Sequence, residues 1–255
     1  MRDYAKTAST VTENSTIFRQ WPTAYDTALS LSAAPHVRSV APGLHEKIQK
    51  EDAYAVGRSE TAILAAQALT LYLKTLGQLA DDKVADVSQQ AADITAGLGK
   101  VGADPTGTAI AGVAFKVVGV VLDAVRKRAI VDLITNGHDD VKQLAHYLAT
   151  VAAPNVVKAN IAAESVAKEY WRVAIASTGD VGTRALLFRA QLIDEATFAA
   201  PIAQARAAQA AFKKIGEDQE IPYENRDRLK DAAVRDALLK DVPVLLDAIK
   251  SFQKP

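Results

Sequence analysis

The residues best suited to chemistry are histidines and acids in the middle of the sequence. Asp139, Gln143 and His146 are four and three residues apart, so a helix places them on one face, with His138 beside them. A helix cap followed by surface polar residues explains the same pattern. A carboxylate-bridged di-iron bundle needs Glu-x-x-His on two helices, and that motif does not occur. We therefore predict no catalytic or metal-ligating residue; an enzyme would rest on His138, Asp139 and His146 alone.

A glycine-rich stretch resembles two nucleotide-binding motifs. Residues 97–102 match GxGxxG, but a dinucleotide site needs a strand before the glycines and a helix directly after them. The segment before them has the apolar spacing of a helix, which favours a loop between two helices. Residues 102–108 have glycine spacing like that of a phosphate-binding loop but lack its lysine. The sequence thus predicts no cofactor.

Composition excludes several classes of function. The chain has no cysteine, which removes disulfides, thiolate catalysis and cysteine-based metal sites. Its 30 basic and 30 acidic residues cancel, and we predict no nucleic-acid partner because such binding needs a concentrated basic face. The one basic cluster, residues 126–128, is either a solvated helix face or a contact for a lipid headgroup or phosphate. No signal peptide is visible at the N-terminus, which suits a cytosolic protein or a chain that starts after a removed leader.

Apolar side chains recur every three or four residues over long stretches, which predicts helices. Hydrophobic residues make up 49% of the chain and aromatic ones only 6%, and the abundant alanine favours close helix contact. Long helices are expected at 44–98, 105–135, 140–177, 183–215 and 224–252. We predict an all-α, elongated antiparallel bundle of about five long helices, forming one domain over residues 1–255 in which 1–43 is a helix and loop packed on the bundle. A chain that folds back within 52–96 would contradict this interpretation.

Glycine, proline and capping residues set the expected helix boundaries. Asp104-Pro105 is a helix-start signal and Asn136-Gly137 a stop signal. Residues 178–182 read as a turn and 216–222 as a loop. Kinks or breaks are expected at the prolines inside helices, namely Pro154, Pro201 and Pro243.

The segment 107–125 is apolar nearly all round. Lys116 and Asp123 are its only charges, and Gly112 and Gly119, seven residues apart, share a face that permits close helix contact. Its apolar runs are short for a membrane-spanning helix, and Lys116 at mid-bilayer costs roughly 3 kcal/mol. We interpret the segment, with Phe115 at its centre, as the central core helix. The alternative is a concealed membrane-inserting helix that leaves the core.

Tyr170, Trp171 and Arg172 form a second candidate surface. An aromatic pair beside an arginine suits a partner-binding patch, while aromatic residues at helical spacing also occur in cores. Both interpretations stay open at the level of sequence.

Two segments resemble uncharacterised helical lipoproteins of Gram-negative bacteria. The first is residues 71–82, LYLKTLGQLADD; the second is residues 212–217, FKKIGE, leading to Asn225 and Leu229. The resemblance implies a periplasmic protein tethered to the outer membrane by a lipidated N-terminal cysteine. This sequence has no cysteine, so the anchor would have to be lost from it. The family offers no catalytic residues.

Together these features predict a non-enzymatic helical-bundle scaffold or binding protein of the bacterial cell envelope, with a protein as partner. Long amphipathic helices offer extended faces on which other helices can dock. The alternative function is an α-helical pore-forming or membrane-perturbing component that uses residues 107–125. The expected location is periplasmic or tethered to the outer membrane, with the cytoplasm as the alternative.

Overall fold

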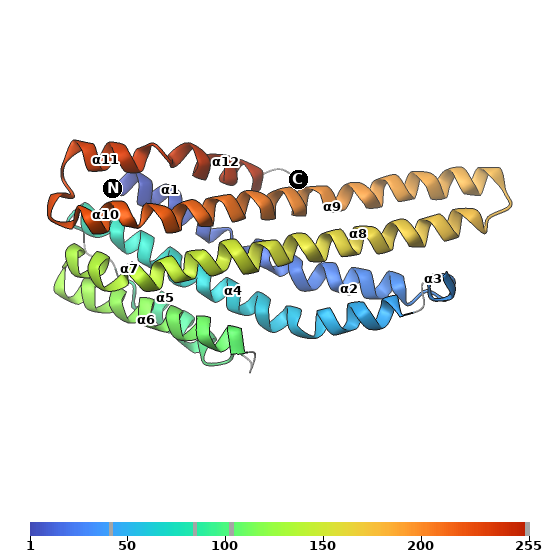
Figure 1. The fold of residues 1–255 in the computed structure, drawn as a ribbon, viewed down its shortest axis with the longest axis horizontal. Coiled ribbons are helices and arrows are strands. Elements are labelled where there is room, and N and C mark those ends of the chain that lie inside the picture. The colour runs from blue at the N-terminus through green and yellow to red at the C-terminus, as the bar shows by residue number, and fades with distance from the viewer. Residues whose placement is uncertain (41–42, 84–85, 102–104, 253–255) are drawn as a thin grey trace.

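The structure is a computed structural model that describes residues 1–40, 43–83, 86–101 and 105–252. It is 89% helical, and no strand occurs in the described part, which confirms the all-α class. The helices lie roughly along one axis in an elongated molecule (Figure 1). They are more numerous than the expected five, because several predicted long helices are interrupted.

The N-terminal part comprises α1 (Arg2–Glu13), η1 (Ser15–Arg19), α2 (Gln20–Ser32), α3 (Pro35–Val40), α4 (Leu44–Ala80), α5 (Ser88–Leu98) and α6 (Pro105–Lys127). The C-terminal part comprises α7 (Ile130–Tyr147), η2 (Leu148–Ala152), α8 (Ala153–Ala176), α9 (Val181–Asp218), α10 (Glu220–Glu224), η3 (Arg226–Arg228), α11 (Ala232–Leu239) and α12 (Val242–Phe252). The region 1–43, expected as one helix and a loop, therefore contains several helices, the last of which is the short α3.

Helix α4 is the central element of the core. It packs against α1, α2, α6 and α7, and its second half is buried on several sides. Its fully buried side chains include Leu69, Tyr72, Leu73 and Leu76. Alanines at 62, 65, 66 and 68 are fully buried as well, and such small side chains let neighbouring helices approach closely.

The predicted single helix over 44–98 is wrong. Helix α4 ends at Ala80, Asp82 adopts a positive φ of 54°, and α5 runs back along α4. A Cβ placed on Gly97 would lie only 2.6 Å from Leu64 Cδ2, so the chain does fold back within 52–96. The periodicity over 88–98 therefore belongs to a second helix that buries Ala91, Ile94 and Leu98. Val84 lies outside the described residues.

The predicted stop at Asn136-Gly137 is also wrong, because α7 continues through it. The break comes earlier, at Arg128, whose φ is 55°. A Cβ at position 137 would lie 2.9 Å from Tyr72 Cε2, so the glycine provides room for the ring rather than ending the helix. The predicted N-cap Asp104, like Gly102 of the glycine motif, lies outside the described residues.

The predicted kink at Pro154 appears as a π-helical segment. Residues Leu148–Ala152 widen the helix by one residue per turn between α7 and α8. Pro154 lacks an N–H and its ring crowds the carbonyl of Thr150, so a wider turn just before it relieves both effects. One helical rod thus continues from Ile130 to Ala176.

The C-terminal helices differ from expectation in two places. Helix α9 passes through Gly216, so the predicted loop over 216–222 is wrong; a Cβ on this glycine would lie 3.2 Å from that of Ala145, so the helices approach closely here. The predicted helix over 224–252 is divided into η3, α11 and α12, and Pro243 sits in the first turn of α12. Pro201 stays inside α9.

Helices α8 and α9 form the longest hairpin of the molecule. The predicted turn at 178–182 joins them, and Asp180 Oδ2 accepts a 2.5 Å hydrogen bond from the backbone N–H of Thr183, capping α9. The hairpin extends past α2, α3 and α4 at the end opposite to α10 and α11 (Figure 1). The turns of α8 and α9 nearest to the connecting turn therefore have few neighbouring helices.

Candidate functional sites

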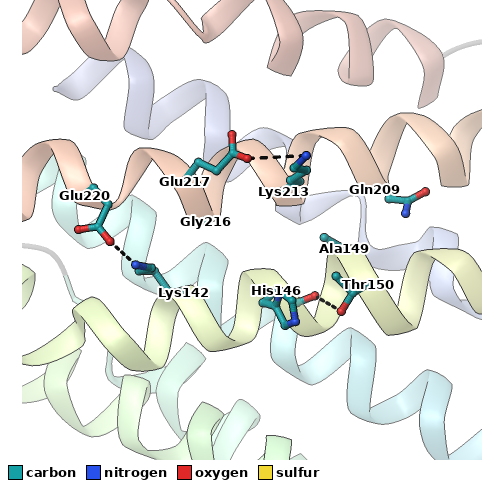
Figure 2. A pocket seen from close by; sticks show the side chains of 9 residues that line it. All are labelled: Lys142, His146, Ala149, Thr150, Gln209, Lys213, Gly216, Glu217 and Glu220. Carbon is teal, nitrogen blue, oxygen red and sulfur yellow. Dashed lines mark hydrogen bonds and ion pairs between the residues drawn. The ribbon is translucent and has the colours of Figure 1, made fainter.

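A groove of about 560 Å³ lies between α9 and the rod formed by α7 and the π-helical segment. Ala149 and Thr150 of the π-helical segment line one wall, and Gly216 lies on the other (Figure 2). Small residues on both sides create the space, since longer side chains would fill it. The remaining lining residues are Lys142, His146, Gln209, Lys213, Glu217 and Glu220.

The charges around this groove already pair with each other. Lys142 Nζ donates to Glu220 Oε1, and this hydrogen bond lowers the pKa of Glu220. Lys213 Nζ lies 3.9 Å from Glu217 Oε1 along α9 (Figure 2). No nucleophile stands beside a base here, and no cluster of three metal-ligating acids or histidines occurs in the described part of the chain. The groove has room for a small molecule.

The structure brings together two members of the histidine cluster considered from the sequence. His138 is buried, its ring stacks on Tyr223 with centroids 3.9 Å apart, and its Nε2 lies 3.5 Å from Glu220 Oε2. Asp139 is exposed, yet its Oδ1 lies 3.8 Å from His138 Nε2. The structure therefore brings His138 and Asp139 together, while His146 is exposed and faces other surroundings than the buried His138.

A buried carboxyl at the end of α9 is the polar feature that sequence reasoning missed. Lys214 Nζ lies 3.3 Å from Asp218 Oδ1 and 3.0 Å from Asp241 Oδ2, so one lysine serves two acids. Burial raises the pKa of Asp218 to about 7, with Lys214 opposing the shift and Asp241 adding to it. Burial also raises the pKa of the nearby Tyr4, with Asp218 contributing. The i, i+4 spacing of Lys214 and Asp218 was visible in the sequence, but the third member, Asp241, comes from the turn between α11 and α12.

The segment 107–125 lies at an edge of the molecule, so its interpretation as the central core helix is wrong (Figure 1). One face of α6 is buried against α4, α5 and α7. Phe115 is 47% exposed, and Lys116, Gly112 and Gly119 are exposed with it. Nothing lies within 4 Å of a Cβ placed on either glycine, so they make no close helix contact.

The side chains at 170–172 form contacts within the hairpin. Trp171 Nε1 donates a 2.9 Å hydrogen bond to Asp194 Oδ2 of α9, and Tyr170 packs edge-on against the indole. Arg172 makes two hydrogen bonds to Glu169 on its own helix. The aromatic pair is half-buried. Trp171 thus ties α8 to α9 near the end of the hairpin.

The first half of α9 exposes more large apolar side chains than any other helix described. Val181 is 77% exposed and Phe188 53%, although both are apolar. The other large apolar side chains exposed by more than half on this half-helix are Leu186, Leu192 and Ile193. The side toward α8 is half-buried at Leu187 and Gln191 and buried at Phe198. Sequence reasoning missed this surface because its apolar side chains have the same spacing as those of a helix face that packs against a core.

The chain matches no protein-family model, and the searches of curated proteins and of solved structures found no match. The resemblance of residues 71–82 to helical lipoproteins therefore stays a prediction. In the structure, this segment spans the buried end of α4 and the turn after it.

Proposed function

We propose that the protein is a non-enzymatic helical-bundle scaffold of the bacterial cell envelope that binds a protein through the end of the α8–α9 hairpin. The observation that carries the proposal is the exposed apolar surface of α9 between Val181 and Ile193. Removing apolar surface from water stabilises an interface by about 25 cal/mol per Å². Large exposed apolar surfaces mark interaction sites on soluble proteins.

The shape of this region supports the same proposal. The hairpin extends beyond its neighbours, so a partner can reach α9 without displacing another helix (Figure 1). A hydrogen bond between Trp171 and Asp194 joins α8 to α9 near this end. A pre-ordered helix face reduces the entropy lost on binding.

Photo-crosslinking in the source cells tests the proposal with a matched control. A benzophenone amino acid replaces Phe188 in one variant and Phe115 of α6 in the other, two phenylalanines of similar exposure. We expect protein adducts at position 188 and none at position 115. Absence of protein adducts at position 188, in cells where the variant is folded, contradicts the proposal.

Membrane contact through α6 is the second candidate function. In the described part of the chain, α6 alone is long and apolar enough to cross a membrane, although one of its faces is buried in the fold. Phe115 and Leu122 are exposed on its outer face, and Arg126 and Lys127 follow in its last turn. This arrangement suits a helix that lies on an anionic lipid surface.

Vesicle assays separate the two candidates. The wild-type protein and a Phe115→Ser/Leu122→Ser variant are mixed with vesicles of phosphatidylglycerol and phosphatidylethanolamine. Membrane contact requires cosedimentation or dye leakage by the wild type and its loss in the variant. Absence of both signals for the wild type between pH 5 and pH 8 rejects the second candidate.

A further inference from the structure

We propose that the partner of the α9 surface is a second copy of this chain, docked antiparallel on the same helix. The inference rests on the proposed function and specifies its partner. The surface is an apolar stripe with the opposite charges of Arg184 and Glu195 on its border nearest α8 and the exposed Arg189 on its other border. The apolar stripe and the pair of opposite charges suit self-association.

The apolar stripe has the spacing of a helix-packing seam. Val181, Ala185, Phe188, Leu192 and Ala196 are four, three, four and four residues apart, so they share one face of α9. All five are exposed, and Phe188 and Leu192 are the large side chains at the centre. Alanines on either side of these two leave room for the partner's larger residues. Such alternation of large and small residues is what interdigitating helices need.

The direction of the second copy's helix follows from which residues of the two stripes face each other. When Phe188 of one copy meets Leu192 of the other in an antiparallel pair, the midpoint falls at residue 190. Ala185 then faces Glu195 of the other copy, and Arg184 faces Ala196. A parallel pair would instead place identical residues opposite each other, including Arg184 on Arg184.

Charge complementarity supports the antiparallel arrangement. Arg184 and Glu195 lie on the border of the stripe nearest α8, eleven residues apart. In the register above, each approaches its opposite charge in the other copy, so the pair forms twice. Each also retains hydrogen-bonding capacity, since Arg184 Nη2 donates to the Thr178 carbonyl and Glu195 Oε1 accepts from Gln191. In pairs of helices, opposite charges beside the apolar seam determine which helices pair and in which direction they run.

The size of the surface sets the expected affinity. From Val181 to Ala196 the stripe is about 23 Å long at 1.5 Å per residue. One stripe of that length buries less than the roughly 1,200–2,000 Å² of a stable complex. The expected dimer is therefore weak and depends on concentration, with a dissociation constant in the micromolar range or above.

Analytical ultracentrifugation of the full chain over a concentration series, from about 1 µM to 1 mM, tests the inference. The wild type is expected to shift from one copy to two. A Phe188→Ser/Leu192→Ser variant should stay monomeric, while the control Phe115→Ser/Leu122→Ser should dimerise like the wild type. Arg184→Glu and Glu195→Arg should each weaken the dimer at least several-fold, and the double reversal should restore it. Circular dichroism checks that each variant is folded.

Several results would overturn the inference. They are a wild type that is monomeric throughout, a dimer unaffected by the stripe variant, and a double reversal that restores nothing. Vesicle binding that the stripe variant abolishes, without a dimer, would assign the surface to lipid. A monomer whose position 188 still crosslinks to a different protein refutes the second copy while leaving the proposed function standing.

Discussion

The two halves of α9 are both amphipathic and have opposite surroundings. Residues 205–218 bury Ala205, Ala208, Phe212 and Ile215 against the rest of the fold. Residues 181–197 bury no side chain, although they carry more large apolar residues than 205–218. Amphipathic spacing thus predicts that a helix has an apolar face but not whether the chain itself covers that face.

The largest difference between the two halves of α9 is expected in the free energy of unfolding when one phenylalanine of each half is replaced by alanine. Phe212 is fully buried and stacks on Phe18 with centroids 5.9 Å apart. Phe212→Ala should lower the free energy of unfolding by about 3–5 kcal/mol, because it leaves a cavity. Phe188→Ala should change it by less than about 0.5 kcal/mol in dilute solution. Urea unfolding measures both; equal losses would show that Phe188 is covered within the monomer.

A pH-dependent difference is expected at the buried end of α9. The pKa of Asp218 is raised to about 7 from an ordinary 3.8, because its carboxyl is buried and faces Asp241 as well as Lys214. The folded chain holds this proton while the unfolded chain releases it, so the stabilisation is complete below pH 3.8 and is lost as pH rises to about 7.

Asp218→Asn removes this titration while keeping the shape of the side chain. Lys214 retains Asp241, 3.0 Å away. Relative to the wild type, the variant should therefore gain roughly 2–4 kcal/mol of stability between pH 4 and pH 8. Denaturation at a series of pH values gives the difference directly. A difference that stays constant with pH would show that Asp218 is not protonated in the fold.

Two glycine-to-alanine substitutions should change the stability of the fold in opposite directions. Gly137→Ala places a methyl group 2.9 Å from the Tyr72 ring and should destabilise the fold by about 1–3 kcal/mol through overpacking. Gly112→Ala on the outer face of α6 meets nothing within 4 Å and should stabilise by about 0.5–1 kcal/mol. Thermal unfolding checks both, and a stabilising Gly137→Ala would refute the close contact.

The smallest effect is expected at the turn of the hairpin. Asp180 caps α9 through the backbone N–H of Thr183. Asp180→Ala should loosen the first turns of α9 by about 1 kcal/mol, with little change in global stability, because these turns have few neighbours. Hydrogen exchange near Val181 should accelerate while exchange near Phe212 stays the same. Equal acceleration at both places would show that the hairpin end unfolds only together with the core.

The sequence predicted the all-α class and the turn at 178–182 correctly, because both follow from local spacing. The predictions failed where a contact between residues far apart in the sequence determines the local structure. Gly137 resembles a helix stop and instead accommodates Tyr72. Residues 88–98 resemble a continuation of α4 and instead form α5, whose Gly97 lies against Leu64.

The candidate sites were less accessible to sequence reasoning than the fold. The groove is lined by Ala149 and Gly216, which are distant in the sequence. The pairing of Lys214 with both Asp218 and Asp241 joins α9 to the turn between α11 and α12. The α9 stripe was visible as a pattern, but its exposure follows from the length of the hairpin relative to its neighbours. Side-chain spacing carries no information on that length difference.

Hydrogen exchange of α9 at two protein concentrations tests the central claim most directly. At about 1 µM, amides of residues 181–197 should exchange much faster than those of 205–218, since exposed helix turns open locally. At about 1 mM, 181–197 should become protected while 205–218 stay unchanged. Slow exchange of both halves at the low concentration, or no added protection at the high one, would contradict the claim that α9 presents an uncovered surface for a second copy.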